Sequence, residues 1–492
     1  MTESTIPVVA SPAGADAGTA ADAKPAPVSA SGKIGFVSLG CPKALVDTES
    51  IIGELLHAGY ETVSDYGEAD VVIVNTCGFI DAAVEESLAT IEQALDENGR
   101  VIVTGCLGTQ KQLLDEKFPK LLHVSGPQAI AEVTHAVRNW QPLEGAATPA
   151  STAQSTKQQG ANHLVYQQLH GERALLTPRH YAYLKISEGC NHKCSFCIIP
   201  SMRGKLRSRG IADNLREAQK LADSGVRELL VISQDTSAYG VDLHYREETF
   251  AGRELSSDLR TLSQELGDMF DWVRLHYVYP YPNVDGLMEL MAAGQLLPYL
   301  DVPLQHGDPA ILRAMRRPAA AETTLERIHN WRKVVPDLKL RSTFIVGFPG
   351  ETEAAFDTLL EFLQEAQLDR VGAFTYSDVA GAGAQALPNH VDEAVKQERL
   401  ARFMALQEDI SRNKLKSWRG QETQVLVDAL ENVNGTSTAV GRTYADAPDI
   451  DGVVHIRDAA HLQVGDFAWV TIDDSDSHDL YATALGQPLG IQ

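Results

Sequence analysis

The chain has 492 residues, of which 44% are hydrophobic and 22% charged, so its composition excludes a wholly disordered protein. Its apolar runs, such as Val71-Val72-Ile73-Val74, have the length of a strand, whereas a membrane-spanning helix needs about 20 apolar residues. The formal net charge of −24 disfavours a general nucleic-acid coat, which would be basic, and suits a basic partner.

The first 140 residues divide into a tail and an α/β segment. Residues 1–32 are rich in Ala and Pro and contain a single basic residue, which predicts a disordered tail and argues against a secretory signal. From residue 33 on, strands and helices alternate. Strands are predicted at 34–39, 71–75, 101–104 and 121–124, and helices at 49–58 and 82–95. This alternation predicts a doubly wound parallel sheet in a domain of residues 33–140.

A second alternating series follows a polar stretch, residues 141–178, that we interpret as a linker. Strands are predicted at 181–187, 228–233, 272–275, 299–302, 340–346 and 370–375, with helices such as 214–224 and 353–367 between them and a long helix at 392–416. Six β/α units predict a full or partial parallel barrel over residues 179–416.

The last segment, residues 417–492, changes to a pattern of short strands. Strands are predicted at 423–428, 452–456 and 467–472, with turns at Asn434-Gly435 and Val464-Gly465-Asp466. The pattern predicts a small all-β, OB-like barrel. The segment contains three basic and twelve acidic residues, a net charge of −9.

Three of the six cysteines lie within eight residues. Cys190, Cys194 and Cys197 follow the first strand of the predicted parallel barrel, where such barrels bind their ligands. Without a secretory signal we expect a cytoplasmic protein with reduced thiols. Three thiolates at this spacing suit a 4Fe-4S cluster with one open iron, and a zinc site with His192 as the fourth ligand is the alternative.

The other three cysteines, Cys41, Cys77 and Cys106, each follow a predicted strand. Because the carboxyl ends of strands in a doubly wound sheet meet at one crevice, we expect these cysteines to converge. Glycines at positions 40, 78, 105 and 108 would let the backbone approach closely. The pattern predicts a second three-cysteine cluster, and the alternative is three unrelated buried cysteines.

The segment Cys190-Asn191-His192-Lys193-Cys194-Ser195-Phe196-Cys197 resembles the signature of radical S-adenosylmethionine enzymes, in which an aromatic residue precedes the last cysteine. The C-terminal segment resembles a TRAM domain, notably at Gly441-Arg442-Thr443-Tyr444-Ala445-Asp446-Ala447-Pro448. Together with the N-terminal cysteines, these motifs make residues 33–492 resemble the methylthiotransferases. The resemblance implies an auxiliary-cluster domain at 33–140, a radical S-adenosylmethionine partial barrel at 179–416 and a TRAM domain at 417–492.

The resemblance also implies the cofactors, which are two 4Fe-4S clusters and S-adenosylmethionine. One cluster would be held by Cys41, Cys77 and Cys106, and the other by Cys190, Cys194 and Cys197. One S-adenosylmethionine would yield a 5′-deoxyadenosyl radical, and a second would methylate sulfur held at the auxiliary cluster. The chemistry would take place at the clusters, with no catalytic side chain, because the protein orients the cofactors and excludes water.

Further cofactor contacts implied by the resemblance are Phe196, Gln234, Asp235, Thr236, Ser342, Thr343 and Gly347. Ordinary β-to-α turns with helix caps are the alternative for the motifs at 233–236 and 342–351. His306 is either a pocket residue or a structural histidine. The basic run Arg203, Lys205, Arg207 and Arg209 is either a solvated face or a contact for an acidic group.

Two branches of the family differ in substrate. One modifies an adenosine in transfer RNA, and the RimO type modifies an aspartate of ribosomal protein uS12. The segment from Gly40 to Glu49 resembles the RimO version, with Ala44 and Thr48 as departures from the usual Asn and Ser. The net charge of −9 at residues 417–492 also favours a basic protein over RNA. We therefore expect methylthio transfer to the β carbon of a uS12 aspartate, with transfer-RNA adenosine as the alternative.

A non-catalytic iron–sulfur electron carrier is a further alternative. It would need closed, four-ligand clusters and no large barrel, whereas this chain has two incomplete ligand sets. The resemblance implies a small electron donor such as a flavodoxin or ferredoxin. We expect a cytoplasmic monomer with no membrane partner and no specific nucleic-acid partner.

Overall fold

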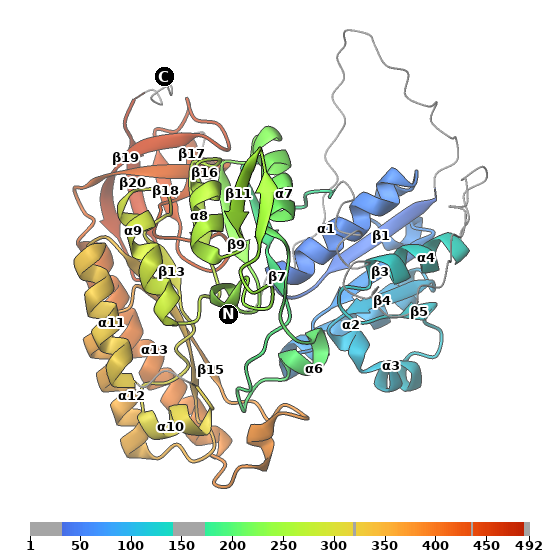
Figure 1. Cartoon of the computed structure of the whole chain (residues 1–492), viewed down its shortest axis with the longest axis horizontal. Helices are drawn as coiled ribbons and strands as arrows, with labels where there is room; N and C mark the ends of the chain where they lie inside the picture. The colour runs from blue at the N-terminus through green and yellow to red at the C-terminus, as the bar shows by residue number, and fades with distance from the viewer. Residues whose placement is uncertain (1–31, 141–172, 318–320, 434–435, 487–492) are drawn as a thin grey trace. The chain divides into compact units, whose positions relative to one another are not determined.

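The computed structural model describes residues 32–140, 173–317, 321–433 and 436–486, which form two compact units (Figure 1). The first unit contains the described residues up to Leu176 together with Ser201–Gly204, and the second contains the others. Nearly all of the predicted tail, most of the predicted linker and the predicted turn Asn434-Gly435 lie outside the described residues.

The first unit is built on a five-stranded parallel sheet in the order β2-β1-β3-β4-β5. The strands are β1 (Lys33–Ser38), β2 (Glu61–Val63), β3 (Val71–Thr76), β4 (Val101–Gly105) and β5 (His123–Val124), and the helices are α1 (Pro42–His57), α2 (Asp81–Glu97), α3 (Lys111–Lys117) and α4 (Ile130–Trp140). This strand order is that of a doubly wound sheet, as predicted.

Helices cover both faces of this sheet, which explains the continuous apolar strands. Every residue of β3 is buried. Val71 and Ile73 pack in the same hydrophobic cluster as residues of α1 and α4, whereas Val72 and Val74 pack with residues of α2 and α3. Successive strand residues point to opposite faces, so a strand covered on both sides is apolar, as in Val71–Val74, except where buried polar side chains are hydrogen-bonded, as Asn75 and Thr76 are.

Helices α3 and α4 were not predicted from the sequence, and two further elements of the first unit also differ from the prediction. Helix α1 begins at Pro42, not at residue 49, because Pro42 occupies the first turn, where a missing N–H costs nothing, and Cys41 is the N-cap. Strand β2 was not predicted, since three residues at the edge of a sheet carry too short a pattern.

The second unit contains a six-stranded parallel sheet in the order β15-β14-β13-β12-β9-β6. Its strands are β6 (Tyr181–Lys185), β9 (Glu228–Ile232), β12 (Trp272–Leu275), β13 (Tyr299–Asp301), β14 (Lys339–Val346) and β15 (Arg370–Thr375). Its helices are α7 (Ile211–Asp223), α8 (Leu259–Gly267), α9 (Leu287–Ala292), α10 (Pro309–Ala314), α11 (Ala321–Val334), α12 (Glu353–Ala366) and α13 (Glu393–Lys416), and α6 (Ile199–Arg203) spans the boundary between the units. Strands β6 and β15 do not pair with each other among the described residues, so the barrel is partial.

Two short antiparallel pairs that the sequence did not predict complete this sheet region. They are β7 (Ser187–Glu188) with β8 (Arg207–Ser208), and the hairpin β10 (Glu247–Phe250) with β11 (Arg253–Ser256). The first pair begins directly before the loop that carries Cys190, so it fixes the start of that loop.

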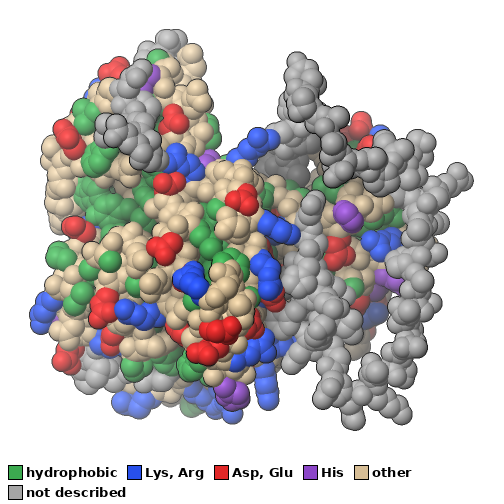
Figure 2. All heavy atoms as spheres, turned by 45° about the horizontal axis from the view of Figure 1, so that its top comes forward, with side chains coloured by type: hydrophobic (Ala, Val, Ile, Leu, Met, Phe, Trp, Pro, Cys, Tyr) green, Lys and Arg blue, Asp and Glu red, His purple; other side chains and the backbone are tan. Residues whose placement is uncertain are grey.

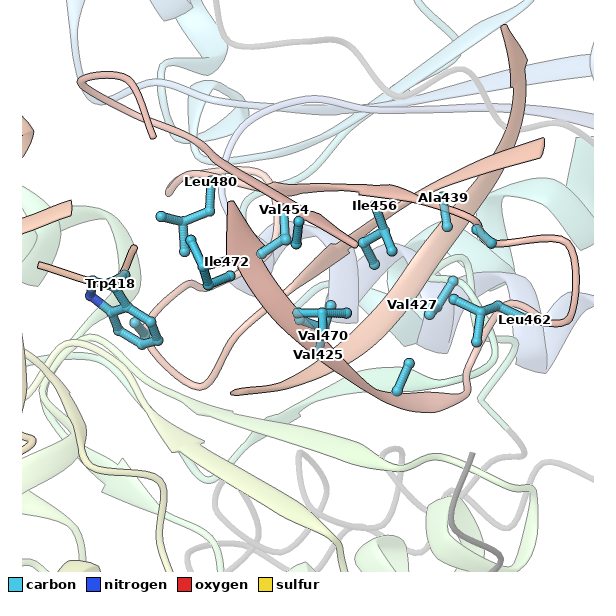
Figure 3. Packing of buried hydrophobic residues seen from close by; sticks show 14 of the residues in the cluster. Trp418, Val425, Val427, Ala439, Val454, Ile456, Leu462, Val470, Ile472 and Leu480 are labelled. Atoms are coloured by element: carbon cyan, nitrogen blue, oxygen red, sulfur yellow. The ribbon is translucent and has the colours of Figure 1, made fainter. Parts of the chain in front are cut away.

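The C-terminal residues form a closed five-stranded barrel. Its strands are β16 (Glu422–Val433), β17 (Thr436–Arg442), β18 (Val454–Arg457), β19 (Phe467–Ser475) and β20 (Leu480–Ala484). Side chains such as Val425, Ile456 and Val470 fill the interior (Figure 3). Strands β17 and β20 were not predicted, yet they are needed to close the barrel and remove its free edges.

A buried charge network joins the two barrels of the second unit. Glu228, the first residue of β9, is fully buried and accepts hydrogen bonds from Arg274 Nε (2.8 Å) and Arg442 Nη1 (2.6 Å). Arg442 also binds Asp428, which in turn contacts His180 at 2.7 Å. Burial opposes ionisation of Glu228, but Arg442 and Arg274 outweigh it and lower the pKa of this carboxyl.

The first residues of two other parallel strands also form hydrogen bonds with the C-terminal barrel. Tyr299, the first residue of β13, donates its hydroxyl to Asp451 at 2.7 Å, and Arg370, the first residue of β15, donates Nε to Asp446 at 3.0 Å. The C-terminal barrel is therefore anchored at the amino ends of the parallel strands, opposite to the ends where such barrels bind ligands.

We expect Arg442→Met to lower the free energy of unfolding by about 3–5 kcal/mol, because it leaves the Glu228 carboxylate buried with one of its two cations removed. Chemical denaturation of the full chain, followed by tryptophan fluorescence, measures this loss. The matched control is Arg457→Met in the same barrel, where an exposed arginine pairs with Asp473 and the expected loss is about 0–1 kcal/mol. Equal effects of the two variants would contradict the role of the network.

Candidate functional site

The loop of Cys190, Cys194 and Cys197 lies between β7 and α6, and each of its thiols has a hydrogen-bond donor beside it. The backbone N–H groups of His192 and Ile199 donate to the Sγ atoms of Cys190 and Cys197, each at 3.4 Å. The Nη1 atom of Arg317 lies 3.7 Å from Cys194 Sγ. Donors directed at sulfur stabilise the thiolate form, which is the form that binds metal.

These thiols influence one another. Burial raises the pKa of Cys190 to about 11 and that of Cys197 to about 12, and the neighbouring cysteines add to the increase. The nearby N–H groups and Arg317 act in the opposite direction. The raised pKa values favour the neutral form of the Cys190 and Cys197 thiols, which must release their protons when they bind a metal centre.

His192 was the fourth ligand in the zinc alternative. Its Nε2 lies 2.9 Å from the Asp235 carboxylate and 2.7 Å from the Tyr281 hydroxyl, and its ring stacks on Tyr279 at 4.2 Å. Ligand atoms of Cys190, His192 and Asp235 lie within 4.8 Å of one another. Because Nε2 is already engaged by two partners, the geometry favours the three-cysteine set over a site that uses this nitrogen.

Gln234 carries an acceptor that fits a bound ligand. Its Nε2 donates to Glu188 Oε1 at 2.7 Å, while its Oε1 is buried with no hydrogen-bond partner among the described residues. Buried acceptors without a partner are rare and call for a ligand or water. The amino and hydroxyl groups of S-adenosylmethionine are donors of the required kind, so this residue fits that cofactor.

Two other residues that were predicted to contact the cofactor use their hydroxyl groups for hydrogen bonds within the protein. Thr236 Oγ1 donates to the His276 carbonyl at 2.6 Å, and Ser342 Oγ accepts from Leu304 N–H at 3.1 Å. Both residues are fully buried. For Thr236 and Ser342 the geometry favours the alternative, in which they tie strand ends together. Phe196 packs in a hydrophobic cluster at the end of α10.

The loop after β14 is held by a buried carboxylate. Gly347 has φ of +73° and donates its N–H to Glu351 Oε2 at 2.9 Å. Any side chain there would meet Lys396, with an added Cβ only 2.3 Å from its Cγ. Glu351 also binds Arg399 Nη1 (2.8 Å) and His306 Nε2 (3.1 Å). Glycine is thus required at position 347 for both backbone shape and space.

Two predicted residues near this loop have mixed surroundings. Thr343 is half-buried on β14, paired in register with Gly372 of β15. His306 is buried, binds Glu351 and also lines a small cavity with Leu304 and Arg317. His306 is therefore both a hydrogen-bonded structural histidine and a cavity residue.

In the first unit, three adjacent strands carry the other cysteines. Cys41, Cys77 and Cys106 directly or nearly follow β1, β3 and β4, which are neighbours in the sheet. Gly40 has φ of +91°, and a Cβ added there would lie 2.9 Å from Cys77 Cβ. A Cβ added to Gly78 would lie 2.7 Å from Leu107 N, next to Cys106. The glycines let the three strand ends approach one another.

Buried cations lie near two of these thiols, Cys41 and Cys106. Arg203 Nε donates to Cys106 Sγ at 3.3 Å, and Arg203 Nη1 lies 3.4 Å from Asp47. Burial raises the pKa of Cys106, with Arg203 opposing. At Cys41 burial also opposes ionisation, but Lys43 and Arg203 outweigh it and lower the pKa. A positive, buried environment suits thiolates and the anionic metal centre that they would bind.

The basic run at residues 203–209 is therefore not exposed to solvent along its whole length. Arg203 and Arg209 are buried, and Arg209 pairs with Glu217 at 2.6 Å as Arg203 pairs with Asp47. Lys205 is exposed and Arg207 is half-buried. For the two buried arginines the contact with an acidic group is the correct interpretation.

Sequence reasoning missed Glu188, Tyr279 and Arg317. Glu188 stands two residues before Cys190, and this proximity was an available signal. Tyr279 and Arg317 belong to loops far along the chain, and no local pattern connects them with the cysteines.

Three family models match successive parts of the chain. They are described as uncharacterized protein family UPF0004 (residues 33–126), radical SAM superfamily (184–363) and TRAM domain (420–485). The ribosomal protein uS12 methylthiotransferase RimO of Stenotrophomonas maltophilia strain K279a is 56% identical over 92% of this chain and 96% of its own length. The chain belongs to the RimO family of methylthiotransferases.

Other RimO proteins are equally similar. That of Nitrosomonas eutropha is 54% identical over 92% of this chain and 97% of the relative. That of Acidithiobacillus ferrooxidans is 57% identical over 92% of this chain and 98% of the relative. Because it belongs to the RimO family, the chain is a radical S-adenosylmethionine enzyme. This membership does not favour the two alternatives considered from the sequence, a transfer-RNA methylthiotransferase and a non-catalytic electron carrier.

We expect Gly40→Ala to reduce iron bound after anaerobic reconstitution to roughly half, because a methyl group at φ +91° collides with Cys77 while the other cysteine loop is untouched. Iron and sulfide analysis of the purified chain measures this loss. The control is Gly372→Ala, where an added Cβ meets nothing within 4 Å. Full iron content in Gly40→Ala would contradict the assignment of Cys77 to a metal centre.

Proposed function

We propose that this enzyme adds a methylthio group to the β carbon of an aspartate in ribosomal protein uS12. The observation that carries the proposal is the 54–57% identity to relatives named for uS12 methylthiotransfer, over 92% of this chain. The two three-cysteine sets supply thiolate ligands for the two iron–sulfur clusters that such a reaction needs.

Cys190, Cys194 and Cys197 would hold one 4Fe-4S cluster, and Cys41, Cys77 and Cys106 the other. When bound, the clusters and S-adenosylmethionine supply radical generation and sulfur methylation. The chain's own residues fix the thiolates through N–H donors and present the free Oε1 of Gln234 to a ligand donor.

Other residues set the shape and charge of these sites. The carboxylate of Asp235 lies next to Cys190 and is held there by His192 and by Ser237 Oγ, which is 2.8 Å away. Glu351 fixes the Gly347 loop at the end of β14. In the first unit, Arg203 places a buried positive charge against Cys106.

A basic ribosomal protein is a suitable partner for this chain. The net charge is −24, and residues 417–492 contribute −9. On the described residues that are visible in Figure 2, acidic and basic side chains are interspersed. Charge of this sign speeds the encounter with a basic protein.

The remaining parts of the proposal concern setting and assembly. Among the described residues, no helix combines the length and the apolar character needed to cross a membrane. We place the enzyme in the cytoplasm as a monomer, supplied with electrons by a small flavodoxin or ferredoxin.

The substrate is tested by a competition in one anaerobic reaction. The reconstituted enzyme, reductant and S-adenosylmethionine are offered uS12 and bulk transfer RNA together, and both products are analysed by mass spectrometry. We expect a methylthio mass increment on one uS12 aspartate and none on RNA. An increment on an adenosine would overturn the substrate while leaving the mechanism intact.

The two cysteine sets are distinguished by single substitutions. We expect Cys194→Ala to abolish formation of 5′-deoxyadenosine, since it removes a ligand of the cluster that binds S-adenosylmethionine. Cys77→Ala should retain some cleavage but lose methylthio insertion. Each variant is the control for the other, with both products quantified by chromatography. Full product formation by Cys77→Ala would show that the auxiliary assignment is wrong.

A further inference from the structure

Arg317 is a half-buried arginine beside the first cysteine group that belongs to none of the recognised motifs. It follows α10, and its Nη1 lies 3.7 Å from Cys194 Sγ. Its charge is thus directed at a thiol of this group. Lys193, the cation inside the cysteine loop, is exposed, where solvent and salt screen its charge.

Three contacts hold the Arg317 side chain and backbone in place. Its Nη2 donates to the Pro303 carbonyl, and its guanidinium lies over the Tyr279 ring with Cζ 3.8 Å from the centroid. Its backbone N–H donates to the Leu312 carbonyl at 2.9 Å. A guanidinium stacked and hydrogen-bonded in this way cannot easily turn towards solvent.

The cysteine loop is tied to the same end of α10. Ser195 donates its N–H to the Met315 carbonyl at 3.0 Å and its Oγ to the Ala314 carbonyl at 2.7 Å. The residue after Cys194 is thus bonded to carbonyls two and three positions before Arg317. These bonds fix the distance between the guanidinium and the thiol independently of any bound group.

We propose that Arg317 raises the reduction potential of the cluster held by Cys190, Cys194 and Cys197. This inference rests on the proposed function. Reduction transfers one electron from an external low-potential one-electron donor to the cluster, and no bond forms or breaks in the step. The reduced cluster is more negative by one charge, so a fixed cation in a partly buried site stabilises it more than the oxidised cluster.

The charges that face this site act in both directions. Asp235 lies beside Cys190 and disfavours added negative charge, but its carboxylate is engaged by His192 and Ser237. Arg317 directs its charge at a ligand sulfur itself. Hydrogen bonds and charges at ligand sulfurs are among the main determinants of cluster potential.

The test is a redox titration of the reconstituted full-length chain, followed by electron paramagnetic resonance, with dithionite and mediators. The signal that changes on addition of S-adenosylmethionine identifies the relevant cluster. We expect Arg317→Gln to lower the equilibrium constant for reduction of this cluster about tenfold. This corresponds to a reduction potential about 59 mV more negative for a one-electron step. Arg317→Lys should recover part of the shift. The matched control, Arg313→Gln, removes an exposed charge from α10 and should leave the potential unchanged.

The outcomes separate this inference from the proposed function. A wild-type chain without a cluster that responds to S-adenosylmethionine would refute the proposed function. A normal, responsive cluster whose potential is the same in Arg317→Gln would overturn the role of Arg317 alone. If Arg317→Gln fails to bind iron, Tyr279→Leu replaces it, because it removes the ring under the guanidinium. A smaller negative shift then supports the inference, and no shift overturns it.

Discussion

The candidate site of the first unit depends on the alignment of parallel strands. Because β1, β3 and β4 are neighbours and parallel, their carboxyl ends lie along one edge of the sheet, and residues that follow them meet there. Cys41, Cys77 and Cys106 are far apart in the chain and are brought together in this way. The glycines beside them remove the side chains that would keep the strand ends apart.

Buried charge is the second recurring feature of the structure, and it has two distinct uses. At the amino ends of the partial barrel, Glu228 and Arg442 are paired with each other and with further charged groups, so the network anchors the C-terminal barrel. Near the cysteines, the buried Arg203, which also pairs with Asp47, and the half-buried Arg317 each direct a cation at a sulfur atom. A buried cation is costly unless it is paired, and a thiolate or an anionic cluster is a suitable partner.

The two ends of the parallel strands in the second unit therefore have different tasks. The amino ends are occupied by the contacts of Glu228, Tyr299 and Arg370 with the C-terminal barrel. The carboxyl ends carry the cysteine loop, Gln234 and the Gly347 loop. Anchoring at one end is compatible with ligand binding at the other, since the contacts described at the two ends are made by different residues.

The sequence by itself determined the class of each sheet and the identity of the metal-binding thiols proposed here. Periodicity is a local property, so long apolar strands such as β3 and β14 were predicted within a residue or two, whereas β2 was missed because three residues at the edge of a sheet carry little local pattern. Strands β17 and β20 of the closed barrel were missed as well. Spacing likewise singled out Cys190, Cys194 and Cys197, the positions after predicted strands singled out the other three cysteines, and the family resemblance singled out Gln234.

Tertiary structure alone decided which groups act on those thiols. Thr236 and Ser342 matched a motif, yet their hydroxyls are used in internal hydrogen bonds. Arg317 and Tyr279 matched no motif, yet Arg317 lies next to Cys194 and its guanidinium stacks on the ring of Tyr279. The physical reason is that hydrogen bonds and Coulomb interactions depend on distance in space, and residues from separate loops acquire that proximity only when the chain folds.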